Sequence, residues 1–190
     1  MATYQVTTPL SEDIIMALHV GDIVTITGHI FGLRDATLIR MFDQKVDIPP
    51  DLTGAICLHT APGVRLEGDR YVKVSIGTTT STRMNRFTEG LMHQGVKAIT
   101  GKGGLLEDST QLLQQHRAVY FGLVGGAAAS ETLQIEEIEE MWWPDLMPEC
   151  LWKFRVRDFG PLIVGIDAYG RNLYLETKQQ ALDVVNHLEI

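Results

Sequence analysis

Hydrophobic and polar residues alternate along several short segments of the chain, which is the pattern of half-buried β-strands. The alternation is clearest over residues 151–157, where aromatic and aliphatic side chains alternate with lysine and arginine, and it recurs over Ile23–Ile30. The uninterrupted apolar run Leu162–Ile166 predicts a central strand, buried on both faces. Further strands are predicted at Tyr4–Thr7, Ala55–His59, Tyr71–Ile76, Val96–Thr100, Ala118–Leu123 and Leu173–Leu175.

Apolar residues spaced three to four positions apart predict helices elsewhere. Met84, Phe87 and Leu91 have this spacing, a Thr or Ser at 79–81 can cap the start, and Gly95 suits the end, so a helix is expected over Thr79–Gln94. Gln134–Met141 fits either a helix or a strand. Other helices are predicted at Ile14–Leu18 behind Ser11, at Leu33–Phe42, at Leu105–Gln115 and around Ala181–Leu188, and Gly125–Ala129 is expected to turn into a helix packed closely against a sheet.

The predicted elements add up to a mixed α/β fold in which strands outnumber helices. They do not alternate strictly, which disfavours a regular doubly wound nucleotide-binding sheet. The chain contains no internal repeat and no Pro/Gly/Ser-rich linker. We therefore expect residues 1–190 to form a single domain.

Composition and charge narrow the range of partners. Hydrophobic residues make up 45% and charged residues 21% of the 190 positions, which is ordinary for a globular protein. A net charge of −8 argues against non-specific binding to nucleic acid, but it allows an anionic ligand at a locally cationic site. The polar segment Met1–Leu10 does not resemble a secretory signal, and the apolar stretches are too short to cross a bilayer, so a cytoplasmic location without membrane contact is expected.

The two cysteines, Cys57 and Cys150, lie far apart in the sequence. Buried or free thiols are expected in preference to a disulfide. A [4Fe–4S] cluster is typically held by three or four thiolates, so any such cluster must come from another chain. The six histidines show no metal-ligand spacing, and no metal site is predicted in this chain.

Three segments place cations or hydroxyls at predicted strand ends, where open α/β sheets bind ligands. These segments are Gly32–Asp35, Gly77–Met84 and Gly101–Gly104. Together they supply two guanidiniums, one ammonium and several hydroxyls. Arginine can hold a carboxylate with two parallel hydrogen bonds and lysine acts as a point charge, so the set suits a small polyanion.

Each segment also has a purely structural interpretation. Arg83 would sit unfavourably in the first turn of a helix unless an anion lay beside it, yet it could also pair with a surface carboxylate. Arg34 could pair simply with its neighbour Asp35. Gly101–Gly104 could be a structural turn, since Val96 stands where a phosphate-binding loop needs its first glycine. The acidic stretch Glu136–Glu140 is interpreted as a solvated face.

Several short motifs follow one another along the chain in a characteristic order. They are Val20–Asp22, Gly28, Arg34-Asp35, Thr79–Met84, Gly101–Gly104 and Gly125–Ala128, then Met147–Glu149, Leu151-Trp152, Phe159–Val164 and Asp167. In this order they resemble the C-terminal domain of class I fumarases, which in many prokaryotes is a separate β subunit. The later motifs are similar to those of two-subunit fumarases and L(+)-tartrate dehydratases. The similarity extends from about Tyr4 to Tyr174.

The resemblance implies a swivelling β/β/α domain in a hetero-oligomer, or a homodimer when isolated. A partner α subunit would hold a [4Fe–4S] cluster whose unique iron acts as Lewis acid for the hydroxyl. The implied reaction is reversible hydration of fumarate to malate, or dehydration of L(+)-tartrate or a related diacid. Arg34, Arg83 and Lys102 would bind the dicarboxylate. Thr79 would act in catalysis with Arg83 and Lys102, close to the carbon that exchanges a proton and activated by a carboxylate of the partner.

Some positions depart from the family pattern. Leu38 stands where histidine is usual, Thr78 replaces proline, Ala61-Pro62 replaces Gly-Pro, and a glycine before Met147 is missing. These departures leave two alternatives open, a stand-alone anion-binding module and a structural or assembly subunit. They also leave open which diacid binds and with what stoichiometry the subunits assemble.

Overall fold

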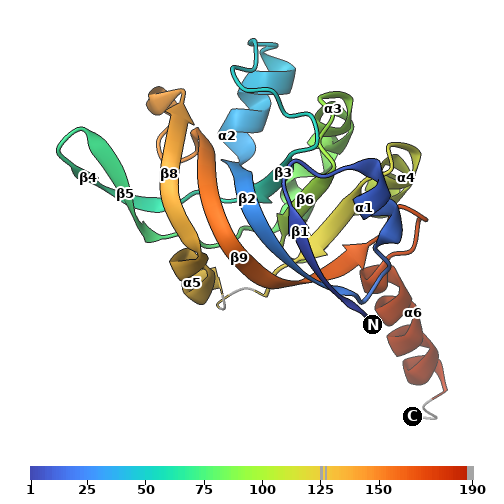
Figure 1. Cartoon of the computed structure of the whole chain (residues 1–190). Helices are drawn as coiled ribbons and strands as arrows, with labels where there is room; N and C mark the ends of the chain where they lie inside the picture. Colours follow the sequence, from blue (N-terminus) through green and yellow to red (C-terminus); the bar gives the residue numbers. More distant parts are fainter. Residues whose placement is uncertain (125, 127, 188–190) are drawn as a thin grey trace.

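A seven-stranded mixed β-sheet forms the body of the protein (Figure 1). The computed structural model describes residues 1–124, 126 and 128–187. The five strands β1, β2, β3, β6 and β7 are parallel neighbours in this order, and β9 runs antiparallel to β2, β7 and β8. The strands are β1 (Thr3–Thr7), β2 (Ile23–Leu33), β3 (Ile56–His59), β6 (Ala98–Gly101), β7 (Val119–Gly122), β8 (Ile135–Trp142) and β9 (Leu151–Ile166).

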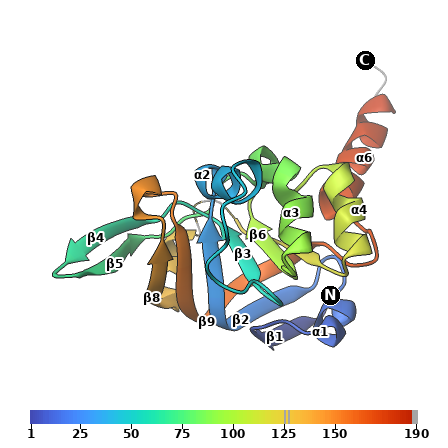
Figure 2. The same ribbon diagram turned by 90° about the horizontal axis from the view of Figure 1, so that it is seen from above.

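Strand β9 closes the sheet on itself, because it pairs with both β2 and β7. Figure 2 shows the result as three layers: β1, β2, β8 and β9 form one, β3 and β6 the next, and helices α2, α3 and α4 cover the far side. This arrangement confirms the predicted α/β class with a mixed sheet and β/β/α layers. A swivelling motion of the domain stays a prediction.

Two hydrophobic clusters lie on opposite faces of the layer that contains β3 and β7. In β3, Ile56 and Leu58 belong to the cluster enclosed by the strands, while Cys57 between them belongs to the cluster under the helices. In β7, Phe121 and Tyr120 divide in the same way. Burial on both faces explains why these segments read as continuous apolar runs, since successive side chains of a strand point to opposite sides.

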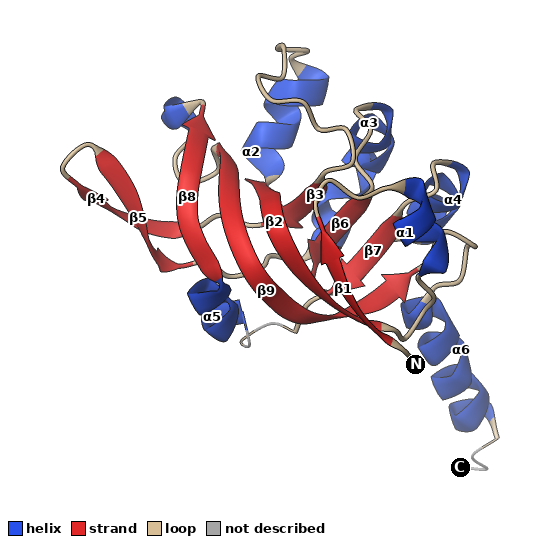
Figure 3. Cartoon of the chain, in the orientation of Figure 1, coloured by secondary structure: helices blue, strands red, loops and turns tan. Residues whose placement is uncertain are grey.

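The helices are short, except for the last one (Figure 3). Ser11 caps the first helix through its hydroxyl, which accepts a hydrogen bond from the Ile14 amide, as predicted. In the described part of the chain, none of the helices has the length and apolar character needed to cross a membrane. The helices are α1 (Glu12–Ala17), α2 (Asp35–Leu38) with a π-helical turn (Ile39–Asp43), a 3₁₀ helix (Ser81–Phe87) leading into α3 (Thr88–His93), α4 (Glu107–Gln115), α5 (Ala128–Glu131) with a 3₁₀ turn (Thr132–Gln134), a 3₁₀ turn (Pro144–Leu146), and α6 (Leu173–Asn186).

The predicted helix over Thr79–Gln94 is wrong at its start. Thr80 still pairs with Lys102 in a parallel β-bridge, so helical structure begins only at Ser81, and it begins as a 3₁₀ helix without a side-chain cap. The rest of the prediction is confirmed, because Met84, Phe87 and Leu91 are buried.

The predicted strand Leu173–Leu175 is also wrong, because these residues form the first turn of α6. The Asn172 side chain caps this turn by accepting hydrogen bonds from the amides of Tyr174 (3.0 Å) and Leu175 (3.3 Å). A short apolar run cannot be assigned from periodicity alone, and here the cap decided the outcome. The helix projects away from the sheet in both views (Figures 1 and 2).

In three other segments the observed secondary structure adds to or differs from the prediction. The two strands expected around 152–157 and 162–166 are one strand, β9, which is irregular where Asp158 and Gly160 adopt positive φ angles of 49° and 140°. The ambiguous segment Gln134–Met141 is mainly the strand β8. A hairpin of β4 (Gly63–Glu67) and β5 (Arg70–Ser75) extends from the side of the sheet, and its first strand was not predicted. The close packing expected for Gly125–Ala129 lies largely outside the described residues.

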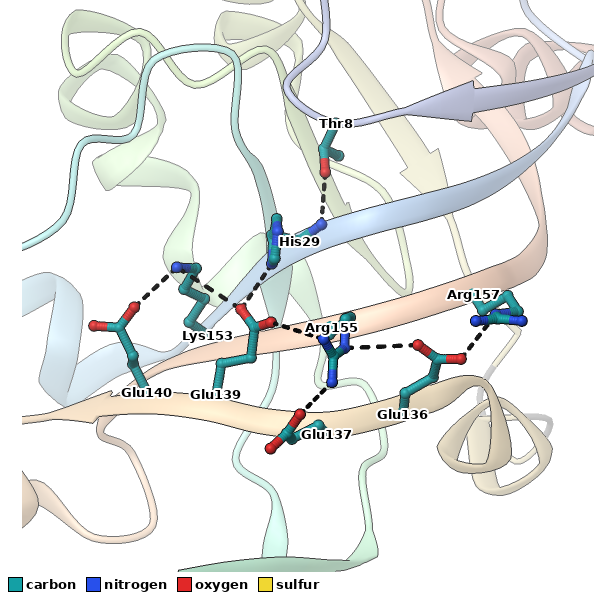
Figure 4. Close-up of polar contacts among 9 residues, drawn as sticks. All are labelled: Thr8, His29, Glu136, Glu137, Glu139, Glu140, Lys153, Arg155 and Arg157. Atoms are coloured by element: carbon teal, nitrogen blue, oxygen red, sulfur yellow. Dashed lines mark hydrogen bonds and ion pairs between the residues drawn. The ribbon is translucent and has the colours of Figure 1, made fainter.

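The acidic segment 136–140 lies along β8, where its carboxylates face basic side chains on β9 and β2 (Figure 4). It is largely exposed, as predicted, but its charges are paired. His29 Nδ1 lies 2.7 Å from Glu139 Oε2, and Arg157 Nε lies 2.8 Å from Glu136 Oε1. The remaining pairs join Lys153 to Glu139 and Glu140, and Arg155 to Glu136, Glu137 and Glu139.

Candidate functional site

The candidate residues gather at one edge of the sheet because the strands before them are parallel. Arg34 follows the end of β2, and Lys102 follows the end of β6. Between these strands lies β3, which pairs in parallel with both and ends at His59. The carboxyl ends of adjacent parallel strands meet at the same edge, where open α/β sheets place ligands.

Arg34 and Arg83 meet at a shared carboxylate, that of Asp35. Arg34 Nε lies 3.1 Å and Arg83 Nη2 lies 3.0 Å from Asp35 Oδ2. The local ion pairs that the sequence left open are therefore present. They also bring together two guanidiniums from distant positions in the chain. Side-chain exposures of 25% for Arg34 and 52% for Arg83 leave both within reach of a ligand.

Glu149 approaches the same Nε atom of Arg34, and the sequence indicated it only as part of a motif. Its Oε1 atom lies 3.3 Å from Arg34 Nε, and its Oε2 atom accepts a hydrogen bond from the Ala36 amide at 2.8 Å. The hydroxyl of Thr37 donates to the Glu149 carbonyl. Both contacts of Arg34 use Nε, so its terminal nitrogens make no hydrogen bond with the described residues.

Thr79 and Lys102 are joined to each other through the backbone. The Lys102 amide donates to the Thr79 carbonyl at 3.3 Å, and the Thr79 amide donates to the His59 carbonyl at 2.9 Å. Just beyond Lys102, Gly103 and Gly104 have φ angles of +81° and +73°, so the chain bends here in a conformation that favours glycine.

A continuous backbone path connects this pair to the arginines. Leu33, the residue before Arg34, is in register with His59, whose carbonyl binds Thr79. In the described residues, however, the side chains of Thr79 and Lys102 make no hydrogen bond or ion pair with either arginine. The structure thus brings the two arginines into one cluster, and it places Thr79 and Lys102 beside them on the same edge.

His59 lies beneath this edge and was not singled out by the sequence. It is 1% exposed, and burial lowers its pKa to about 4, although the negative charge of Asp35 acts in the opposite direction. Its ring is therefore neutral near pH 7. The available signal was its position, since a histidine directly at the end of an apolar strand is placed where such sheets bind ligands.

The positions that depart from the family pattern also have clear places. Leu38 is completely buried in the cluster beneath the helices. The hydroxyl of Thr78 donates to the His59 carbonyl at 3.3 Å, next to the hydrogen bond from the Thr79 amide. A proline at position 78 would lack this hydroxyl contact.

The two cysteines are buried and free, as predicted. Burial raises the pKa of Cys57 to about 12 and that of Cys150 to about 11, so both remain thiols near pH 7. Metals and iron–sulfur clusters are bound by thiolates. Across residues 1–124, 126 and 128–187, no group of three or more His, Cys, Asp or Glu side chains is arranged to hold a metal ion.

Comparison with known proteins gives matches over most of the chain. The family model described as the fumarase C-terminus matches residues 2–177. The L(+)-tartrate dehydratase subunit beta of Escherichia coli (strain K12) is 41% identical over 175 residues, covering 91% of this chain and 87% of that protein. A putative L(+)-tartrate dehydratase subunit beta of Methanocaldococcus jannaschii is 34% identical over 94% of this chain and 95% of its own length. A putative class I fumarate hydratase of Geobacillus stearothermophilus is 33% identical over 95% of this chain but 35% of its own length.

Proposed function

The chain belongs to the fumarase C-terminus family, and from this premise we propose that it is the β subunit of a hydro-lyase acting on a small dicarboxylate. The reaction is reversible hydration of fumarate to malate, or dehydration of a related hydroxy-diacid. Two of the relatives are named as tartrate dehydratase subunits, so L(+)-tartrate is the first alternative to fumarate.

The observation that carries this proposal is the meeting of Arg34 and Arg83 at Asp35, on the sheet edge that also bears Thr79 and Lys102. Three cations at this edge outnumber the two carboxylates of Asp35 and Glu149, so the local charge favours an anion although the whole chain is acidic. The carboxylates also hold the guanidiniums in place before the ligand arrives. Such preorganisation reduces the entropy lost on binding.

We assign the arginines to the carboxylates of the substrate. A guanidinium can donate two parallel hydrogen bonds to one carboxylate, and the terminal nitrogens of Arg34 are available for this. Lys102 supplies a further positive charge on the same sheet edge. Fixing both ends of a diacid orients the carbon atoms between them, which converts binding energy into correct geometry for proton transfer.

Thr79 is assigned to the carbon that exchanges a proton. Its backbone is held by His59 and Lys102, so the main chain from which its hydroxyl projects is fixed. A threonine hydroxyl is too weakly acidic to act alone as a base near neutral pH, and it requires a neighbouring base to activate it. In the proposal that base is a carboxylate of the partner subunit.

The resemblance also implies a [4Fe–4S] cluster, and the residues of this chain do not fit one. Its two cysteines are buried thiols, Cys57 in β3 and Cys150 just before β9. The described residues offer no group of side chains arranged to bind a metal. We therefore assign the cluster to a partner α subunit. The contribution of this chain is the dicarboxylate-binding half of the site.

The test is anaerobic purification of the tagged chain together with its natural partner. The complex is expected to be brown, to contain a cysteine-rich chain, and to turn over fumarate or L(+)-tartrate, whereas the isolated chain does neither. A colourless, inactive preparation with no co-purifying chain contradicts the proposal.

Two further measurements separate the alternatives. Calorimetry of the isolated chain with fumarate and tartrate tests a stand-alone binding module, which must bind its ligand unaided. Replacing Arg34 or Lys102 in the complex tests a purely structural subunit, for which these changes leave activity intact. Our proposal expects weak or no binding by the isolated chain and a large loss of activity in the variants.

A further inference from the structure

Three buried side chains from different elements form a continuous hydrogen-bonded series beneath the site. His59 Nδ1 lies 3.0 Å from Ser81 Oγ, and Ser81 Oγ lies 2.9 Å from the hydroxyl of Tyr120. His59 ends β3, Ser81 begins the 3₁₀ helix, and Tyr120 lies in β7. Each of the three is at most 1% exposed. Fully buried polar groups of this kind are sensitive to the loss of any partner.

The same residues hold the two candidate site residues through the backbone. The His59 carbonyl accepts the hydrogen bond of the Thr79 amide at 2.9 Å, and the Ser81 amide donates to the Lys102 carbonyl at 2.9 Å. The residues that carry the buried side-chain series therefore also hold the backbone of Thr79 and Lys102 through their own main-chain atoms.

Ser81 is closely packed against Gly101 and Tyr120. A Cβ atom at Gly101 would overlap Ser81 Oγ, and it would also come within 3.4 Å of the Tyr120 hydroxyl. The Tyr120 ring is in turn packed edge-on against Tyr174 at 6.0 Å between ring centres. The serine hydroxyl thus lies between His59 and Tyr120 of the sheet, and Tyr120 in turn packs against Tyr174 of α6.

One atom of the series is unpaired. His59 Nε2 is buried and has no hydrogen-bond partner in the described part of the chain. A buried polar atom without a partner destabilises a fold, and such atoms need a reason to persist. Because the ring is neutral, the free-energy penalty of its unpaired Nε2 atom is smaller than for a charged ring, and Nδ1 remains available to Ser81.

We propose that His59, Ser81 and Tyr120 form a positioning network that sets the location of Thr79 and Lys102 for the reaction. The inference rests on the proposed function, and it adds residues that do not touch the substrate themselves. Displacing a reacting group by about 1 Å can reduce a rate by about a hundredfold, so a network of this type affects turnover more than binding.

Two variants remove single hydroxyls while keeping the packed volume nearly unchanged, Tyr120→Phe and Ser81→Ala. In the assembled enzyme we expect kcat to fall by about tenfold or more, while KM changes by less than about threefold. The matched controls are Tyr169→Phe, whose hydroxyl donates to the Met16 carbonyl at 2.8 Å, and Ser109→Ala, a buried serine that donates to Asn85 Oδ1 at 2.7 Å. Ser109→Ala loses a buried hydrogen bond and Tyr169→Phe an exposed one, both outside the series, and both variants should keep kcat within about twofold.

Rescue by a conservative change distinguishes positioning from general stability. His59→Asn can retain a polar atom near the place of Nδ1, whereas His59→Leu cannot. We expect the asparagine variant to keep more activity than the leucine variant at equal folded fraction. Equal activities for the two variants, with kcat of Ser81→Ala and Tyr120→Phe unchanged, would overturn the proposal.

A readout that does not depend on catalysis separates this inference from the proposed function. In NMR spectra of the isolated chain, Ser81→Ala should change the tautomer of the His59 ring, and Tyr120→Phe should shift the amide resonances of Thr79 and Lys102. If the wild-type complex is inactive but these shifts occur, the network stands and the proposed function fails. If the complex is active and the shifts are absent, the positioning network is refuted and the proposed function stands.

Discussion

Replacing Arg83 with alanine is the change that most clearly separates the proposed role of the cationic edge from a structural role. Without ligand, the Arg83 side chain is 52% exposed, and its ion pair with Asp35 at 3.0 Å is partly solvated. Exposed ion pairs contribute about 0–1 kcal/mol to stability, so the variant should fold normally. Its effect on the reaction should be much larger, because a charge-assisted hydrogen bond to a bound carboxylate is removed.

The expected magnitude follows from the contact that is lost. Hydrogen bonds to charged groups contribute about 1.5–3 kcal/mol, which corresponds to a roughly ten- to hundredfold decrease in kcat/KM. Arg83→Lys keeps the charge but loses the two-pronged geometry, so its decrease should be smaller than that of the alanine variant.

Arg86 provides a matched control on the same 3₁₀ helix. Its side chain is 59% exposed and pairs with Asp43 at 2.7 Å, so Arg86→Ala removes the same kind of surface ion pair without touching the candidate site. The assay measures fumarate or tartrate turnover by the assembled complexes, and thermal unfolding checks that both variants fold. Equal kcat/KM values for Arg83→Ala and Arg86→Ala would refute the assignment.

Three further predictions concern stability. Burial lowers the pKa of His59 from 6.5 to about 4, so the neutral ring contributes stability above pH 6.5 that is lost as the pH falls through 4. Between pH 7 and pH 4.5, the free energy of unfolding in urea should fall by about 2–3 kcal/mol more for the wild type than for His59→Gln. Parallel pH dependences of the two proteins would contradict this. Burial raises the pKa of Glu131 to about 7, so Glu131→Gln should be more stable than wild type at pH 8.5 and similar to it at pH 5; no gain at high pH would show that this carboxylate is stabilised when ionised. Gly104→Ala should destabilise by more than the Gly68→Ala control in thermal unfolding, because both glycines have positive φ but only a side chain at 104 would meet the Tyr174 ring, at 2.7 Å; equal losses would mean that the ring moves aside freely.

Much of the sheet could be predicted because its strands have strong two-residue alternation or continuous apolar character. The strands around 23–30, 55–59 and 118–123 lie close to their predicted bounds, since burial of one or both faces dictates their residues. The hairpin strand 63–67 was missed because most of its side chains are exposed and carry no apolar pattern. Local pattern also failed where a tertiary contact decided the structure, as in the β-bridge between Thr80 and Lys102 that delays the helix to residue 81.

The candidate site was predictable in its residue types and less so in its architecture. Arg34, Thr79, Arg83 and Lys102 were identified because they occur at strand ends and in family motifs. The sequence could not show that Asp35 bridges the two arginines, because Arg83 lies 48 positions from Asp35 along the chain. The buried series from His59 to Tyr120 was invisible for the same reason, since its hydrogen bonds span 22 and 39 positions.

The central claim, that Arg34, Arg83, Thr79 and Lys102 surround one dicarboxylate, is tested most directly by a crystal structure of the assembled enzyme with a non-reactive diacid bound. The account predicts one ligand carboxylate on the guanidiniums, the ammonium of Lys102 at the other end, and the Thr79 hydroxyl beside the carbons between them. A ligand bound elsewhere, without contact to either guanidinium and with Lys102 facing solvent, would contradict it.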